Sequence, residues 1–252
     1  MDSTALAVLL GAVVAGPGSV LVPQIIGLVP EIVPGPQPEP SEPGSTEPEA
    51  EPKTPEDPPE PFADIAVLPG LGLRSALAGA VVGAVVGYAV GWHWAWALWV
   101  PMVPVYVALA VVDWRTRLLP TYLIRPLYVV LVVLVAGGAV GTGDHHAAVR
   151  AALGWLVAGL LYGVLWFIYP RGLGFGDVRL SGVLGIALGW VGWGPLMIGV
   201  YAGFLLGGVG GGLLSAVRVV ERKGFPFGPF MLVGAVVGLL WGAGLWSGLL
   251  GH

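Results

Sequence analysis

Residues 123–141 read LIRPLYVVLVVLVAGGAVG, and from Leu127 onward this stretch carries no charged side chain. A helix of about 20 apolar residues is long enough to cross a hydrocarbon core of roughly 30 Å. The stretch is too long and too uniformly apolar for a half-buried surface helix. It therefore predicts a helix that spans a membrane.

Similar apolar stretches occur on both sides of this one. They predict further helices at 4–29, 74–93, 94–112, 150–169, 178–194, 195–217 and 229–250. Glycines recur at close spacing within them, as at Gly83 and Gly87 and from Gly207 through Gly212, and small residues let membrane helices approach closely. The expected fold class is all-α: a polytopic transmembrane bundle of about eight helices.

Composition supports membrane residence. Hydrophobic residues make up 56% of the 252 residues, charged residues only 10%, and the mean hydropathy is +0.85. A water-soluble domain carries roughly a quarter charged residues, so the composition excludes an ordinary soluble fold. The lipid bilayer is the expected partner. Nucleic acid is not, because the basic residues are scattered singly rather than clustered on one face.

The residue types that bind metals are sparse. The chain has no cysteine, and its four histidines form no spaced ligand set. His145 and His146 are adjacent, and we interpret them as part of a solvated loop rather than a metal site. The sequence predicts neither a metal nor a cofactor.

The chain divides into three parts by composition. Residues 1–30 predict an N-terminal transmembrane helix, which we expect to be retained because Met1-Asp2 opens it and no basic residue precedes Lys53. Residues 31–73 begin with a block rich in Pro and Glu, and we interpret this part as a disordered acidic cytoplasmic segment that acts as a linker, not as a docking motif. Residues 74–252 form the third part, a transmembrane domain.

Positive charge indicates the orientation, because Lys and Arg favour the cytoplasmic side. With eight helices and the N-terminus outside, ten of the eleven basic residues fall on one side and only Arg150 on the other. Those ten are Lys53, Arg74, Arg115, Arg117, Arg125, Arg171, Arg179, Arg218, Arg222 and Lys223. Asp113 and Asp177 are then both cytoplasmic, whereas Asp144 lies in an external loop.

Asp113 directly follows an apolar run, and Asp177 directly precedes one. Such interfacial aspartates are costly, and each has a basic neighbour with which it can pair: Arg115 or Arg117 for Asp113, and Arg179 for Asp177. The alternative is a catalytic pair in which one carboxylate keeps a proton, because two close carboxylates do not both ionise cheaply. Gly174 and Gly176 favour the catalytic pair, because they give Asp177 a rim without side chains. An extended substrate can bind along this rim.

Three motifs in order resemble the prepilin peptidases, also called type IV leader peptidases, which are membrane aspartic proteases of the Gly-x-Gly-Asp type. They are Asp113-x-x-Thr-x-x-Leu-Pro120, Gly174-Phe-Gly-Asp177-Val-Arg-Leu180 and Phe225-Pro-Phe-Gly-Pro-Phe230, and the resemblance covers about residues 74–250. We interpret the third motif as a packing and family marker rather than a reactive site.

The resemblance implies an aspartic endopeptidase of the cell inner (plasma) membrane, with Asp113 and Asp177 as its catalytic pair. It also implies the substrate: the short basic leader of a prepilin or pseudopilin, cut after a glycine at the cytoplasmic face. Many family members also methylate the new pilin N-terminus. Gly16-Pro-Gly-Ser-Val-Leu-Val-Pro23 matches that part of the family only in outline, so the sequence predicts the peptidase and not the methyl transfer.

Two other functions compete with this hypothesis. A proton-coupled transporter would use the same aspartates as a proton relay, but transporters place such carboxylates near the midplane and show internal repeats. An inactive scaffold for pilus or secretion assembly would not require an intact pair of aspartates.

Overall fold

The structure is a computed structural model, and it describes residues 2–31, 59–170, 172–216 and 225–251. All regular structure within these ranges is helical. The elements are α1 (Ser3–Ser19), α2 (Val22–Gly27), α3 (Phe62–Ala66), α4 (Leu71–Val90), α5 (Trp94–Trp99), the 3₁₀ turn η1 (Val100–Met102), α6 (Val103–Thr116), α7 (Thr121–Thr142), α8 (His145–Ile168), α9 (Phe175–Val191), α10 (Trp193–Ala216) and α11 (Gly228–Leu250).

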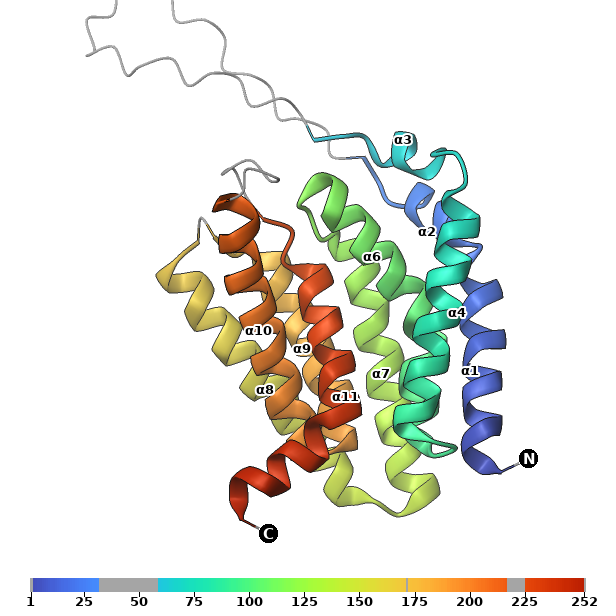
Figure 1. Cartoon of the computed structure of the whole chain (residues 1–252), viewed down its shortest axis with the longest axis vertical. Helices are drawn as coiled ribbons and strands as arrows, with labels where there is room; N and C mark the ends of the chain where they lie inside the picture. Colours follow the sequence, from blue (N-terminus) through green and yellow to red (C-terminus); the bar gives the residue numbers. More distant parts are fainter. Residues whose placement is uncertain (1, 32–58, 171, 217–224, 252) are drawn as a thin grey trace, which may run out of the picture.

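The long helices run side by side as one bundle (Figure 1). Within the described residues, five spans are long and apolar enough to cross a membrane. They are α4, the run from α5 through η1 to the end of α6, then α7, α8 and α11. Only helices satisfy every backbone hydrogen bond within one segment when water is absent, which is why an apolar chain of this kind folds this way. The prediction of an all-α, polytopic membrane bundle is confirmed.

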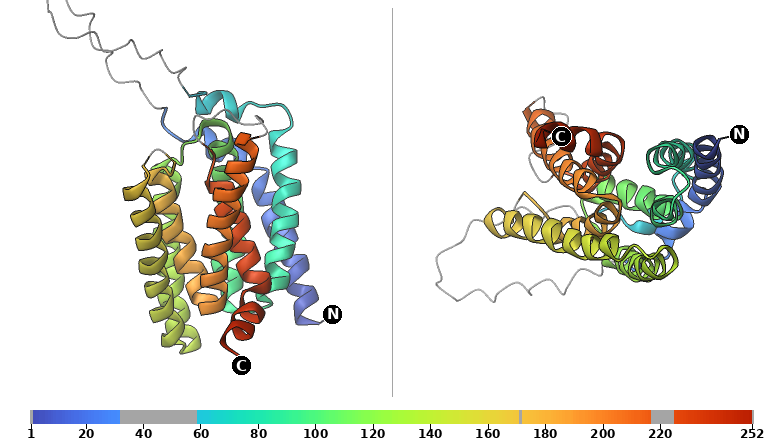
Figure 2. Two further views of the ribbon diagram at one scale, coloured as in Figure 1. Left: turned by 60° about the vertical axis from the view of Figure 1, so that its left-hand side comes forward. Right: turned by 90° about the horizontal axis from the view of Figure 1, so that it is seen from below.

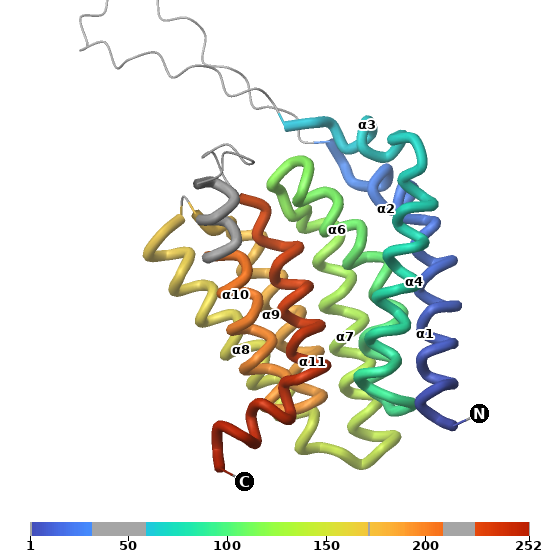
Figure 3. Tube along the Cα trace, viewed as in Figure 1, coloured from blue at the N-terminus to red at the C-terminus, as the bar shows by residue number. Residues whose placement is uncertain are grey.

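The two ends of the bundle differ. Both termini lie at one end, and the short helices α2 and α3 cover part of the other, as the Cα trace shows (Figure 3). Two further views show α1 beside α4 and α10 beside α11 (Figure 2). The loop between α7 and α8, which carries Asp144, lies at the same end as the termini.

The predicted helix at 4–29 is two helices. α1 ends at Ser19, and α2 begins at Val22 with Pro23 in its first turn. Proline has no N–H to donate to the preceding turn, so a continuous helix loses a bond at Pro23. The chain turns there, and α2 covers the end of the bundle instead of extending the span.

The interpretation of residues 31–73 as disordered is wrong for their last part. Phe62–Ala66 is helical and α4 begins at Leu71, while residues 32–58 lie outside the described residues. Phe62 and Ile65 are buried, and the Glu31 carboxylate accepts hydrogen bonds from the N–H groups of Phe62 (3.2 Å) and Ala63 (2.8 Å). Apolar burial and this polar anchor together order the segment.

Glycines set the closest helix contacts, as the sequence predicts for Gly83 and Gly87. A Cβ atom on Gly185 of α9 would lie 2.3 Å from the Gly154 carbonyl oxygen of α8, and one on Gly154 would lie 2.2 Å from the Gly185 carbonyl oxygen. In the α1–α4 pair, a Cβ atom on Gly83 would lie 2.2 Å from the Gly11 carbonyl oxygen, and one on Gly87 would lie 2.3 Å from that of Ala7. Backbones in such contacts leave no space for a methyl group.

Arg150 has a local reason to lie at the opposite end from the other described basic residues. Its Nε donates to the Gly189 carbonyl (2.6 Å) and its Nη2 to the Trp190 carbonyl (2.7 Å). Both carbonyls belong to the last turn of α9, where they have no partner within the helix. Arg150 therefore caps α9.

We expect Gly185→Ala to destabilise the protein by about 1–3 kcal/mol, because the new methyl group overpacks the α8–α9 contact. Gly159→Ala is the matched control: Gly159 lies in α8, and a Cβ atom there meets nothing within 4 Å. Thermal unfolding in detergent measures both. A melting temperature for Gly185→Ala equal to that of Gly159→Ala would contradict the packing.

Candidate active site

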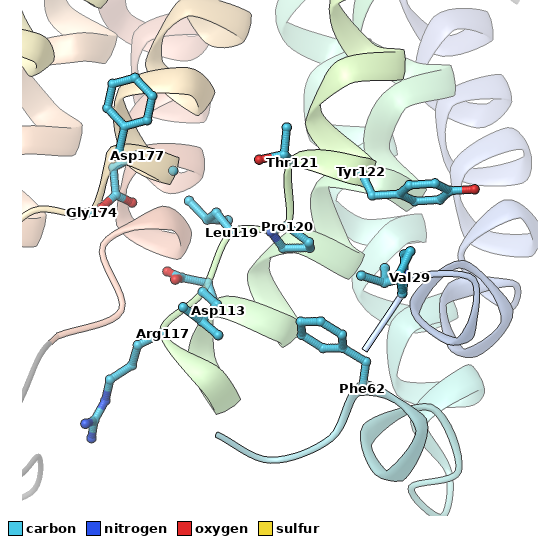
Figure 4. Close-up of a pocket in the computed structure, with 14 residues that line it drawn as sticks. Val29, Phe62, Asp113, Arg117, Leu119, Pro120, Thr121, Tyr122, Gly174 and Asp177 are labelled. Atoms are coloured by element: carbon cyan, nitrogen blue, oxygen red, sulfur yellow. Dashed lines mark hydrogen bonds between the residues drawn. The ribbon is translucent and has the colours of Figure 1, made fainter. Parts of the chain in front are cut away.

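Asp113 and Asp177 lie at the same end of the bundle, in the last turn of α6 and the first turn of α9. Both aspartates line one cavity of about 450 Å³. Asp113 is 3% exposed and Asp177 is 6% exposed. Figure 4 shows the two side chains on the same side of the cavity, with Leu119 beside them. The structure therefore brings together two residues that are 64 positions apart in sequence, whereas Asp144 lies at the other end.

The third motif, residues 225–230, binds the carboxylate of Asp113. The Gly228 N–H donates to Asp113 Oδ2 at 2.8 Å, and a Cβ atom on Gly228 would lie 2.9 Å from that oxygen. A residue with a side chain at this position would push the carboxylate away. Sequence reasoning took Phe225–Phe230 as a packing marker and missed this contact. The sequence signal for this contact was Gly228, a glycine between Phe227 and Pro229.

The carboxylate of Asp177 is held within its own helix turn. The Gly174 N–H donates to Asp177 Oδ2 at 2.8 Å, and the Asp177 N–H donates to the Gly174 carbonyl at 3.0 Å. Asp177 Oδ1 is buried and has no hydrogen-bond partner among the described residues. One oxygen is thus fixed, and the other remains available to a water molecule or a bound ligand.

Gly176 permits close contact with the loop that follows α6. A Cβ atom on Gly176 would lie 2.7 Å from Leu119 Cβ. Leu119 also approaches the third motif, because its Cδ1 would be 3.4 Å from a Cβ atom on Gly228. Leu119 therefore contacts both chain segments that hold an aspartate. Gly174 and Gly176 line the same cavity as the aspartates.

Thr116 and Arg117 determine the path of the loop that follows α6. Thr116 Oγ1 donates to the Val112 carbonyl (2.8 Å) and accepts from the Leu118 N–H (3.2 Å), which closes the end of α6. Arg117 follows with φ 58°, the only positive φ outside glycine in the described residues. This left-handed turn directs Leu118–Thr121 across the cavity.

Two of the basic neighbours have other partners. Arg115 donates from Nε (2.8 Å) and Nη2 (2.6 Å) to the Glu60 carboxylate. Arg179 donates to Thr121 Oγ1, and its guanidinium carbon lies 4.6 Å from the centroid of the Phe175 ring. These contacts do not fit the alternative in which Arg115 and Arg179 neutralise the aspartates. Among the described residues, no three His, Cys, Asp or Glu side chains gather as metal ligands.

Residues 100–214 match the sequence profile of the type IV leader peptidase family. Over this segment the chain is similar to that family. The matched segment contains both aspartates, Gly174 and Gly176, whereas Gly228 lies outside it.

Similar proteins in three bacteria are called prepilin leader peptidase/N-methyltransferase. The protein of Aeromonas salmonicida is 36% identical over 141 residues, which cover 55% of this chain and 47% of the relative. That of Escherichia coli K12 is 37% identical over 145 residues (53% and 58%), and that of Pseudomonas aeruginosa is 29% identical over 141 residues (54% and 46%). The chain thus spans about half the length of these relatives. No solved structure matches it.

We expect Gly228→Ala to destabilise the protein by about 1–3 kcal/mol, because the methyl group displaces the Asp113 carboxylate from its N–H donor. If that carboxylate is the obstacle, the same change made in an Asp113→Ala protein should cost less than about 0.5 kcal/mol. Thermal unfolding of the four proteins in detergent gives the comparison.

Gly248→Ala is the control within the same helix, since a Cβ atom at Gly248 meets nothing within 4 Å. Equal costs of Gly228→Ala with and without the Asp113 carboxylate would show that some other contact is responsible.

Proposed function

We propose that this protein is an intramembrane aspartic endopeptidase that removes the basic leader from type IV prepilins or pseudopilins. One observation carries the proposal: two nearly buried carboxylates from the family domain line the same cavity, and each is held by a glycine N–H. The relatives' names supply the substrate class. We assign the activity to the transmembrane domain, residues 74–252.

The chemistry follows from the shared cavity. Two carboxylates close together in a site of low dielectric constant share one proton more cheaply than they both ionise. The ionised member takes a proton from a water molecule, which attacks the scissile carbonyl, while the protonated member donates a hydrogen bond to the carbonyl oxygen. Because Asp113 and Asp177 titrate together, the two roles belong to the pair.

The fixed oxygens suit this mechanism. Each carboxylate uses Oδ2 to accept a glycine N–H, and that bond orients the group without supplying a mobile proton. A peptidase must also bind its target as extended backbone, and the rim formed by Gly174 and Gly176 presents no side chain to obstruct such a chain. We propose these two glycines as substrate-binding residues.

Charge supports a cytoplasmic active site. The described basic residues Arg74, Arg115, Arg117, Arg125 and Arg179 lie near the end of the bundle that holds the aspartates, and Arg150 lies near the other end. The remaining basic residues of the predicted set, Lys53, Arg171, Arg218, Arg222 and Lys223, lie outside the described residues. We therefore propose an inner-membrane protein with its N-terminus outside and its site at the cytoplasmic face.

The two competing functions, a proton-coupled transporter and an inactive scaffold, make different demands on the aspartates. A proton relay through the membrane places carboxylates near the midplane, but both aspartates here lie at helix ends. A scaffold does not require either carboxylate. Methyl transfer is not part of the proposal, because residues 16–23 match the methylating members only in outline.

We expect Asp113→Asn and Asp177→Asn each to reduce leader removal by about 1,000-fold or more, because an amide neither accepts nor shares the catalytic proton. The assay is cleavage of a co-purified prepilin, followed by mass spectrometry of the product. Asp144→Asn should cleave normally: Asp144 only caps α8 by accepting from the Ala147 N–H at 2.8 Å, and asparagine caps as well. Substantial cleavage by either of the first two variants would remove that aspartate from the mechanism.

The orientation has its own test, made simple by the absence of native cysteine. We expect a membrane-impermeant thiol reagent, added to intact cells, to label His146→Cys and to leave Asp64→Cys unlabelled until the cells are opened. Both positions are exposed, Asp64 in α3 and His146 at the start of α8. Labelling of Asp64→Cys in intact cells would reverse the proposed orientation.

A further inference from the structure

One side chain joins two helix starts that lie at the cavity. Thr121 begins α7 and Phe175 begins α9, and both residues line the cavity with the aspartates. Arg179 lies one turn further along α9 and does not itself line the cavity. Its Nη1 donates a hydrogen bond to Thr121 Oγ1, and its guanidinium carbon lies 4.6 Å from the centroid of the Phe175 ring. Arg179 therefore links the first turn of α7 to the first turn of α9.

Two aromatic side chains fix this link in place. The Tyr128 hydroxyl, further along α7, donates to the Arg179 carbonyl at 2.7 Å. A Cβ atom on Gly182 would lie 2.2 Å from that hydroxyl oxygen, so α7 and α9 are in close contact here. The Trp166 ring of α8 lies 5.1 Å from the Phe175 ring, measured between centroids. The starts of α7 and α9 therefore have one defined relative position.

The link lies on a short path between the two aspartates. Residues 117–120 connect the end of α6, which carries Asp113, to Thr121. In this loop Leu119 packs against Gly176, since a Cβ atom on Gly176 would lie 2.7 Å from Leu119 Cβ. Figure 4 shows Leu119 and Thr121 along this connection. A displacement of Thr121 therefore moves Leu119 against Gly176, the residue that precedes the second aspartate.

The separation of the aspartates matters because of the chemistry that they perform. Two carboxylates share one proton only while they are held close together. A misplacement of about 1 Å can lower an enzymatic rate by about 100-fold, even when the substituted residue is distant from the reacting atoms. A link that only stabilises the fold would instead lower the melting temperature and leave the rate of the folded enzyme unchanged. Rate and stability therefore distinguish the two roles.

We propose that Arg179 is a positioning residue: by holding Thr121 and Phe175, it sets the separation of the Asp113 and Asp177 carboxylates. Arg179 follows Asp177 by two positions, and side chains two positions apart do not face each other on a helix, so its guanidinium acts through its other contacts. The catalytic consequence rests on the proposed peptidase function, whereas the separation of the two side chains can be measured without a substrate.

The first experiment measures this separation, and the absence of native cysteine makes it simple. In an Asp113→Cys/Asp177→Cys protein, a short bifunctional thiol reagent joins the two positions only when both lie within its reach. We expect Thr121→Val, which removes the acceptor oxygen, to lower the cross-linking rate by several-fold in this background. Thr121→Ser, which keeps the hydroxyl, should retain the parent rate. An unchanged rate in Thr121→Val would show that the link does not set the separation.

The second experiment measures cleavage of a prepilin, well below the melting temperature of every variant. We expect Thr121→Val and Arg179→Met each to lower kcat by about 10- to 100-fold with KM nearly unchanged, because a misplaced pair impairs the chemical step and not substrate binding. The double variant Arg179→Met/Thr121→Val should lose no more than the larger single loss, since both changes break the same hydrogen bond. Losses that multiply would show that the two residues act independently.

Thr142→Val is the matched control, because it removes a threonine hydroxyl from the opposite end of the same helix. Thr142 Oγ1 donates to the Gly138 carbonyl (2.7 Å) and accepts from the Asp144 N–H (3.3 Å). The melting temperature of Thr142→Val should fall, while its cross-linking rate and its kcat stay at the parent values.

The two experiments separate this inference from the peptidase proposal. If Thr121→Val slows cross-linking but cleaves the prepilin at the wild-type kcat, Arg179 does not position the pair for catalysis and the inference is wrong, while the peptidase proposal stands. If wild type cleaves no prepilin, the peptidase proposal falls, and the cross-linking rate alone decides whether Arg179 sets the separation.

Discussion

The contact between α8 and α9 is the constraint on which the rest of the structure depends. Gly154 and Gly185 let the two backbones meet without intervening side chains, and this allows α9 to lie inside the bundle. Every residue from Leu180 to Trp190 is buried, so other helices surround α9 on all sides. A helix enclosed in this way has a fixed depth and rotation, and its first turn therefore holds Asp177 at a defined place. Arg150 fixes the far end of the same helix by capping its last carbonyls.

The site shows how a membrane bundle retains carboxylates in a nearly buried cavity. A buried carboxylate needs hydrogen-bond donors, and two strong cationic partners would hold both groups ionised. Here the donors are the N–H groups of Gly174 and Gly228, which are neutral. Glycine suits both positions because the carboxylate lies where a side chain would begin: a Cβ atom on Gly174 would be 3.3 Å from Asp177 Oδ2. The arrangement binds the carboxylates while leaving room for a shared proton.

Sequence was sufficient for features that depend on local pattern. Long apolar runs identify the spans because hydrocarbon imposes a minimum helix length, and positive charge places Asp113 and Asp177 at one end of the bundle. The sequence did not reveal the contacts between segments that are far apart along the chain. Nothing in the composition distinguishes Glu60 from the other acidic residues of its block, yet Glu60 binds Arg115, 55 positions later. The Gly228–Asp113 hydrogen bond joins residues 115 positions apart, so only the folded structure shows that Gly228 binds the Asp113 carboxylate. Phe62 looked like the end of a linker because a single aromatic residue carries no periodicity.

The anchor at Glu31 has a consequence for how this fold tolerates change. The described chain stops at Glu31 and resumes at Pro59, and hydrogen bonds join Glu31 directly to Phe62 and Ala63. The distance between Glu31 and Phe62 is therefore set by these hydrogen bonds and not by the number of residues between them. Closing a longer loop costs little additional free energy, because the entropic cost grows only with the logarithm of its length. The junction is thus a natural insertion point: an entire folded domain with adjacent termini fits between Glu31 and Pro59 without altering the helices that hold the site.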